Sequence, residues 1–232
     1  MITLRRSAER GHSNRGWLDS YFSFSFADYY DSKHMGFRAL RVINDDRIQP
    51  GQGFGPHAHR DMEIITYVLD GHLLHRDSMG ERHILGPNEV QTMSAGTGIV
   101  HSEFNASETE EVHSIQIWIL PAREDVTPTY QQIAFSPEEK QGQLRLLAAP
   151  EAGATIIHQD ARLYVTELAP KQAVRHSLAA GRGAWIQVVG GNVIMNGQEL
   201  SEGDAAALTE ETEVALAGAG SRGGEILLFD LR

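Results

Sequence analysis

The chain has 232 residues, of which 41% are hydrophobic and 22% are charged, and it contains no cysteine. This length allows one large β domain or two small ones with a packed core. The net charge of −11 argues against non-specific binding to nucleic acid, which depends on clustered Lys and Arg. Without cysteine, disulfides, iron–sulfur clusters and thiolate zinc sites are excluded, so imidazole and carboxylate must bind any metal.

The N-terminal segment 1–15 carries four arginines, but no apolar run follows them as it would in a signal peptide. No stretch approaches the roughly 18–20 apolar residues of a membrane-spanning helix. We therefore expect a cytoplasmic protein that contacts neither a membrane nor nucleic acid directly.

Short apolar runs bounded by Gly, Asp, Asn or Pro recur along the chain and predict strands rather than helices. The clearest of these runs lie at 64–69, 115–120, 185–189 and 225–231. Their spacing predicts an all-β protein built as a sandwich or barrel. The dipeptides Asp70-Gly71 and Gly190-Gly191 tolerate positive φ and predict tight hairpin turns.

The composition becomes polar and rich in proline between positions 121 and 143, which predicts a connector. Within it, the run Ser136-Pro137-Glu138-Glu139 is typical of the start of a short helix, with Ser as the cap and Pro in the first turn.

The segment 68–74, read as strand, turn and strand, recurs at 188–194, about 120 positions later in the chain. An internal duplication explains this repeat and predicts two small barrels of like topology. We place an N-terminal domain at 1–125, a linker at 126–143 and a C-terminal domain at 144–232.

Two short clusters of candidate metal ligands lie in the first half of the chain. The first is His57 with His59, and the second is His101 with Glu103. Side chains at i and i+2 of a strand point to the same face, so each pair can converge on one point. A histidine pair alone is as often a hydrogen-bonded strand feature as a ligand pair. The second cluster is what favours a metal site held by two rigid strands.

The other histidines of the first half lie in or near hairpins and strand ends, where a solvated or hydrogen-bonded role is expected: His72, His75, His83 and His113. Trp118 and Trp185 lie inside apolar runs and are expected in the core. The second half has only His158 and His176, without a partner two residues away, so we expect no metal there.

The spacings Gly51-x5-His57-x-His59-x3-Glu63 and Gly98-x2-His101-x3-Asn105 resemble the two motifs of the cupin superfamily. A wider set of segments looks like pirin: 17–20, 24–27, 40–46, 53–55, 57–63 and 93–98. The chain thus resembles the pirin family, and within it the bacterial pirin-like proteins described as quercetin 2,3-dioxygenases.

This resemblance implies two cupin-type jelly-roll barrels in tandem, with a metal only in the first. The implied ligands are His57, His59, His101 and Glu103, all present in this chain. The general cupin pattern would place Glu63 in the carboxylate position instead, and strand parity does not choose between the two. We favour Glu103 as the ligand and expect Glu63 near the metal, orienting a histidine.

The resemblance also implies a metal-dependent dioxygenase that opens the heterocyclic ring of flavonols such as quercetin with O2 and releases CO. Glu103 is the expected catalytic residue, acting as ligand and base in turn. A cavity lined by Ile65, Tyr67 and Leu69 would accept a planar phenolic substrate. The expected cofactor is one divalent transition metal, Fe(II) first, with Cu, Ni, Mn, Co or Zn also compatible with these ligands.

Two other function classes stay open. One is a metal- or redox-sensing regulator that binds a protein partner, because family members in other organisms are described as binding transcription factors or metabolic enzymes. The acidic charge and the metal-free second barrel would suit such a partner. The other is a different cupin chemistry, such as an isomerase or another oxygenase.

Overall fold

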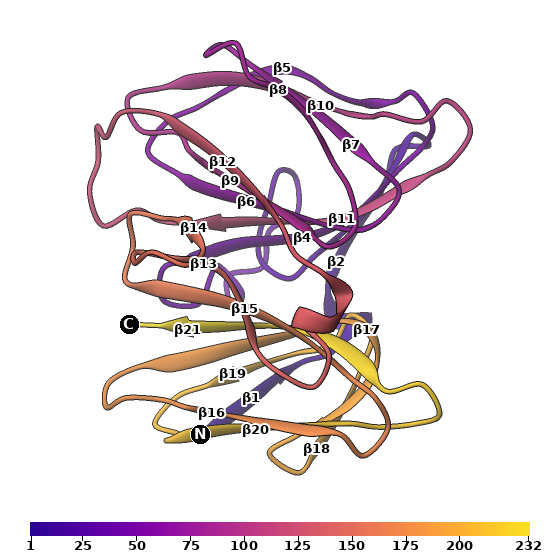
Figure 1. Cartoon of the computed structure of the whole chain (residues 1–232), viewed down its shortest axis with the longest axis vertical. Coiled ribbons are helices and arrows are strands. Elements are labelled where there is room, and N and C mark those ends of the chain that lie inside the picture. Colours follow the sequence, from indigo (N-terminus) through magenta and orange to yellow (C-terminus); the bar gives the residue numbers. More distant parts are fainter. The chain divides into compact units, whose positions relative to one another are not determined.

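Antiparallel strands make up most of the chain in the computed structural model, which describes all 232 residues (Figure 1). The only helices are two three-residue 3-10 turns, η1 (Ser7–Glu9) and η2 (Pro137–Glu139), and no helix is long enough to cross a membrane. The all-β prediction is therefore confirmed.

The chain forms two compact units. The N-terminal barrel comprises Gly11–Phe135 and Thr155–Gln159. The C-terminal barrel comprises Met1–Arg10, Ser136–Ala154 and Asp160–Arg232.

The N-terminal barrel consists of two sheets that face each other as layers (Figure 1). The larger has seven strands in the order β12-β9-β6-β11-β4-β3-β2, and the smaller has four in the order β5-β10-β7-β8. The larger sheet contains β2 (Gly11–Asn14), β3 (Leu18–Phe22), β4 (Leu40–Ile48), β6 (Glu63–Asp70), β9 (Glu89–Ser94), β11 (Val112–Ile119) and β12 (Thr129–Ala134). The smaller contains β5 (Gly53–His59), β7 (Leu73–Asp77), β8 (Arg82–Leu85) and β10 (Ile99–Asn105). The short strand β14 (Thr155–Ile156) belongs to the same unit.

The C-terminal barrel is built around the long strand β17 (Gly183–Met195). One layer has the order β1-β19-β17-β21-β15-β13, and β18 and β20 pair with the end of β17, with β16 beside β20. These strands are β1 (Ile2–Arg5), β13 (Arg145–Ala149), β15 (Ala161–Leu168), β16 (Ala173–Ser177), β18 (Gln198–Ser201), β19 (Ala205–Leu208), β20 (Glu213–Gly218) and β21 (Gly224–Leu231).

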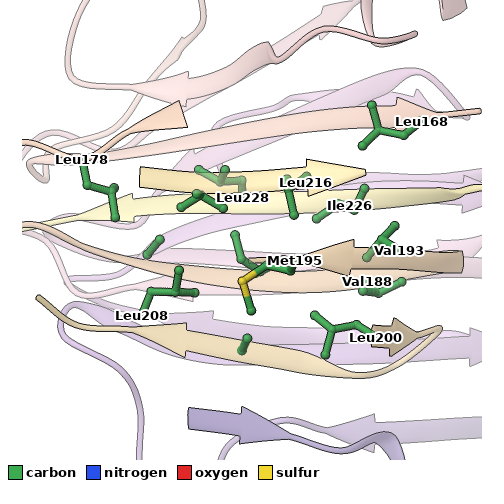
Figure 2. Packing of buried hydrophobic residues seen from close by; sticks show 14 residues of the cluster. Leu168, Leu178, Val188, Val193, Met195, Leu200, Leu208, Leu216, Ile226 and Leu228 are labelled. Carbon is green, nitrogen blue, oxygen red and sulfur yellow. The ribbon is translucent and has the colours of Figure 1, made fainter. Parts of the chain in front are cut away.

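Aliphatic side chains fill the interior of the C-terminal barrel (Figure 2). In β20, the buried Val214 and Leu216 alternate with half-buried residues, which is the period of a strand with one face in the core. Leu216 belongs to the same cluster as Leu228 and Ile226 of β21 (Figure 2). Hydrophobic burial therefore holds this cluster together.

The two glycine dipeptides predicted to be hairpin turns are instead corners between layers. β6 pairs with β9 and β11, whereas β7, which follows Gly71, pairs with β8 and β10. β17 runs through Gly190 and Gly191 without a break. It pairs with β19 before them, with β21 up to and including them, and with β18 and β20 after them. The hairpin prediction was wrong because glycines with positive φ also occur where one strand passes close to the backbone of another. The φ values are +75° at Gly71 and +70° at Gly191.

Part of the segment 126–143, predicted to be a linker, is a strand of the N-terminal barrel. This strand is β12, which pairs with β9 along its whole length. The 3-10 turn η2 begins directly after Ser136, where the sequence predicted a short helix. At the other end of the chain, β1 pairs with β19, and Ile2 and Leu4 pack against the C-terminal core. Met1–Arg10 therefore lie outside the barrel in which the sequence analysis placed them. The other domain bounds stay predictions.

The corner at Gly71 provides a test of the fold. A Cβ there would lie 2.6 Å from the carbonyl oxygen of Glu111, whereas a Cβ at Gly80, which also has positive φ, meets nothing within 4 Å. We expect Gly80→Ala to lower the free energy of unfolding by about 1 kcal/mol through backbone strain alone. Gly71→Ala should cost at least about 2 kcal/mol, because the steric clash adds to that strain. Urea unfolding of both variants measures this, and equal losses would contradict the close crossing.

Candidate metal centre

Three imidazoles converge between the neighbouring strands β5 and β10. Antiparallel pairing places His101 directly opposite His57, and His59 follows two residues later on the same face. The ring centroids are 4.4 Å apart for His57 and His101, and 4.8 Å apart for each of the other two pairs. One ligand nitrogen from each ring lies within 4.8 Å of the others. The structure therefore brings these three predicted residues together.

Glu103 lies on the same strand as His101 and forms a second group of candidate ligands with His101 and His75. The pairing of β10 with β5 shifts register between His101 and Glu103. The buried carboxylate accepts hydrogen bonds from the larger sheet, from Gln116 Nε2 at 3.1 Å and Thr66 Oγ1 at 3.4 Å. The two groups of ligands thus share His101, and the opposite sheet fixes the position of the carboxylate.

His59 and His101 are held in the neutral form that binds metals. Burial, followed by the neighbouring charges of His101 and His57, lowers the pKa of His59 to about 4. Burial and the charges of His57 and His75 lower the pKa of His101 to about 3. His57 donates from Nδ1 to the carbonyl oxygen of Gly55 at 2.8 Å, which leaves the lone pair of Nε2 free.

His101 shows that this donor set fits a metal ion. The residue is only 2% exposed, and neither of its ring nitrogens has a hydrogen-bond partner. A buried polar atom without a partner costs about 1–3 kcal/mol, and a cation that accepts the lone pair would remove part of that cost. Imidazole nitrogens beside a carboxylate oxygen suit the divalent transition metals.

Glu63 occupies a different place from the one expected. Its Oε2 accepts a hydrogen bond from Ser94 Oγ at 2.6 Å, and its Oε1 lies 3.3 Å from His158 Nδ1. Asp61, with a φ of +47°, turns the chain between His59 and Glu63, so strand parity does not carry across. The histidine that Glu63 contacts is therefore His158 rather than a candidate ligand, which corrects the expectation.

His75 is a neighbour of the centre that sequence reasoning underestimated. Its fully buried ring lies 5.3 Å from that of His101. Nε2 is 3.0 Å from Asp77 Oδ2, and Nδ1 is 3.4 Å from Gln91 Nε2. His75 is thus hydrogen-bonded as expected, but its side chain is buried beside the three imidazoles rather than exposed. The His-x-Asp spacing was the only signal for it.

A cavity of about 220 Å³ opens beside the three imidazoles, far larger than the roughly 30 Å³ that one water molecule occupies in the liquid. Its apolar lining includes Leu18, Phe22, Phe26, Phe54 and Trp118, and its polar lining includes Ser20, Asn44, Asp46 and Gln116 beside the candidate ligands. A planar aromatic compound fits the apolar part of this lining, and Ser13 and Arg15 complete the polar part.

The residues that line this cavity differ from those predicted. Thr66 faces Glu103, so the alternating pattern of β6 points Ile65 and Tyr67 away from it, and the Tyr67 ring stacks on that of Phe135. Trp118, expected in the core, is half-buried and lines the cavity, with its ring edge-on to that of His59 at 5.0 Å. Trp185 is buried as predicted.

Asp46 is the buried carboxyl on the wall of the cavity. Burial, opposed by the hydrogen bond donated by Ser20 and assisted by the charges of Asp45 and Glu103, raises the pKa of Asp46 to about 7. The carboxyl therefore changes its charge near neutral pH.

The matching family models identify the family. A model described as "Pirin" matches residues 3–119, and one described as "Quercetinase C-terminal cupin domain" matches residues 146–231. The chain belongs to the pirin family. The predicted pair of cupin-type barrels is thereby confirmed.

Relatives match over the whole chain. A quercetin 2,3-dioxygenase of Escherichia coli (strain K12) is 50% identical over 233 residues, which are 100% of this chain and 99% of the relative. A putative quercetin 2,3-dioxygenase of Pasteurella multocida is 42% identical over 237 residues, 100% of both chains. Among solved structures, the bacterial pirin YhhW from Escherichia coli in complex with nickel(II) has a TM-score of 0.93 at 49% identity, covering 100% of this chain and 99% of that one.

The raised pKa of Asp46 predicts a pH dependence of stability. Because this pKa is about 7 in the folded protein and 3.8 in the reference state, the folded protein binds the proton more tightly. The stabilisation from the protonated carboxyl is complete below about pH 4 and is lost as the pH rises through about 7. The free energy of unfolding of the wild type should therefore fall between pH 5 and pH 8. That of Asp46→Asn should not, so the difference between the two should grow by up to a few kcal/mol in favour of the variant. Urea unfolding of metal-free protein at both pH values tests this, and parallel pH profiles would contradict it.

Proposed function

We propose that this chain is a metal-dependent dioxygenase that opens the heterocyclic ring of flavonols such as quercetin with O2 and releases CO. The observation that carries the proposal is the buried His101, whose two unpartnered nitrogens lie beside two further imidazoles at an aromatic-lined cavity. The relatives named quercetin 2,3-dioxygenase support the reaction and the substrate class.

The proposed ligands are His57, His59, His101 and Glu103. Fe(II) is the proposed metal, and the nickel(II) complex of the Escherichia coli pirin supports a divalent ion in a site of this family. A bound ion of this kind would supply Lewis acidity toward a phenolic hydroxyl and redox capacity for the reaction with O2. Three imidazoles and one carboxylate leave coordination positions free, as a catalytic site requires.

The protein's own side chains hold and orient the substrate. Phe26 and Trp118, whose rings meet edge to face at 5.4 Å, offer apolar surface to a flat ring system and exclude water from it. Because an aromatic wall contacts the ring faces, the substrate enters with its plane defined and its hydroxyls directed at polar groups.

Glu103 is the proposed general base. A carboxylate oxygen of Glu103 takes the proton of the flavonol hydroxyl, and the ring system becomes electron-rich enough to react. Gln116 and Thr66 donate to this carboxylate, so they hold its orientation while it gains and loses the proton. Their role is positioning, since both act through Glu103.

Removal of an imidazole tests the metal site. We expect His57→Ala and His101→Ala each to abolish metal content and quercetin turnover together, because the remaining ligands hold the ion too weakly. Elemental analysis and a flavonol turnover assay on the same preparation measure the two quantities. His83→Ala, an exposed histidine on β8 that bonds to Glu81, is the control and should retain both. Activity lost with the metal fully retained would count against the scheme.

Glu103→Gln tests the base. The amide keeps the size of the side chain but lacks a basic oxygen, so kcat should fall by about 10²-fold or more. Oxygen uptake, normalised to the measured metal content, separates loss of the base from loss of the ion. Turnover per bound ion close to that of the wild type would exclude Glu103 as the base.

A further inference from the structure

The inner face of the seven-stranded sheet carries two polar rows in its centre. Residues directly opposite each other in antiparallel strands share a face, so Asn44, Gln116 and Thr66 form one row across β4, β11 and β6. Ser20 and Asp46 form the next row across β3 and β4. Apolar rows flank both: Leu18, Ile48 and Val112 on one side, and Trp118, Ile64 and Met93 on the other.

The first polar row is only partly satisfied, because Oε1 of Gln116 has no hydrogen-bond partner. Gln116 and Thr66 donate to Glu103 on the opposite sheet. Asn44, at the other end, is 4% exposed and lines the cavity, and its Oδ1 has no hydrogen-bond partner. An acceptor buried in this way destabilises the site until a donor reaches it.

Asp46 extends the same wall. It lies two residues after Asn44 on the same strand face, is also 4% exposed, and lines the cavity. Ser20 donates to its Oδ1. In either protonation state the carboxyl keeps an oxygen that can accept a second hydrogen bond. Two buried acceptors therefore face the cavity side by side, and neither contributes to the proposed metal centre.

We propose that Asn44 and Asp46 determine substrate specificity by accepting hydrogen bonds from hydroxyl groups on the part of the substrate remote from the metal. The site thereby selects polyhydroxylated planar phenols over the same ring skeleton without those hydroxyls. This inference rests on the proposed function. A phenolic O–H is the donor that such acceptors require, and the Phe22 and Phe26 rings beside them accommodate the aromatic ring that carries it.

The strength of the expected discrimination follows from the cost of an unpaired acceptor. A site built to bond a substrate hydroxyl rejects the analogue that lacks it, because the buried polar groups are then left without a partner. One such bond corresponds to about a tenfold change in affinity or more.

Anaerobic calorimetry on nickel-loaded protein tests the proposal, because it measures binding without turnover. The two ligands are quercetin and 3-hydroxyflavone, which keeps the hydroxyl proposed to meet the metal and lacks all others. The wild type should bind quercetin at least about tenfold more tightly. Asn44→Leu and Asp46→Leu should each lower the affinity for quercetin about tenfold. The affinity for 3-hydroxyflavone should stay the same or increase. Asp45→Leu is the matched control on the opposite strand face, where Asp45 meets His113, and should keep the wild-type ratio.

The ratio of the wild-type affinities for the two ligands is measured without any variant. The proposal therefore stays testable even if a variant fails to fold. Equal affinities of the wild type for both ligands would overturn the inference. An unchanged ratio in Asn44→Leu and Asp46→Leu would also overturn it, and either result leaves the proposed function standing. Failure of both ligands to bind the metal-loaded wild type would overturn the proposed function, and this inference with it.

Discussion

The candidate site depends on the antiparallel pairing of β5 with β10. This pairing sets His101 directly opposite His57, and the two-residue period of β5 adds His59 on the same face. Backbone hydrogen bonds hold both strands, so the three imidazoles approach one another without any bond between them. A slip of one residue in this register would turn all of one strand's ligands away from the cavity. The site is therefore a consequence of strand register rather than of any single side chain.

The sheet opposite these strands explains why the barrel tolerates so polar an interior. Gln91, Thr66 and Gln116 hydrogen-bond across to His75 and Glu103, so these buried polar groups find partners between the two layers. Apolar clusters lie on both sides of these polar residues, one around Leu73 and Leu85 and one around Met93 and Ile99. Hydrophobic burial thus stabilises the barrel while its centre stays available for chemistry.

The parts of this site that depend on short-range periodicity could be predicted from the sequence. His57, His59 and His101 were accessible because the i, i+2 rule acts within one strand. Glu63 was misplaced, because the turn at Asp61 resets the parity that the rule assumes. Gly190 was taken for a hairpin, because a glycine pair does not distinguish a turn from a corner within a continuous strand. The polar wall of Asn44 and Asp46 lay beyond sequence reasoning, because it depends on which strands become neighbours.

The central claim is that His57, His59, His101 and Glu103 bind one divalent ion at the cavity. Anomalous diffraction from a nickel- or iron-loaded crystal tests it most directly. The account predicts a single peak between β5 and β10, at about 2.0–2.2 Å from a nitrogen of each of the three imidazoles and from a carboxylate oxygen of Glu103. A peak elsewhere in the barrel, or none in fully loaded protein, would contradict it.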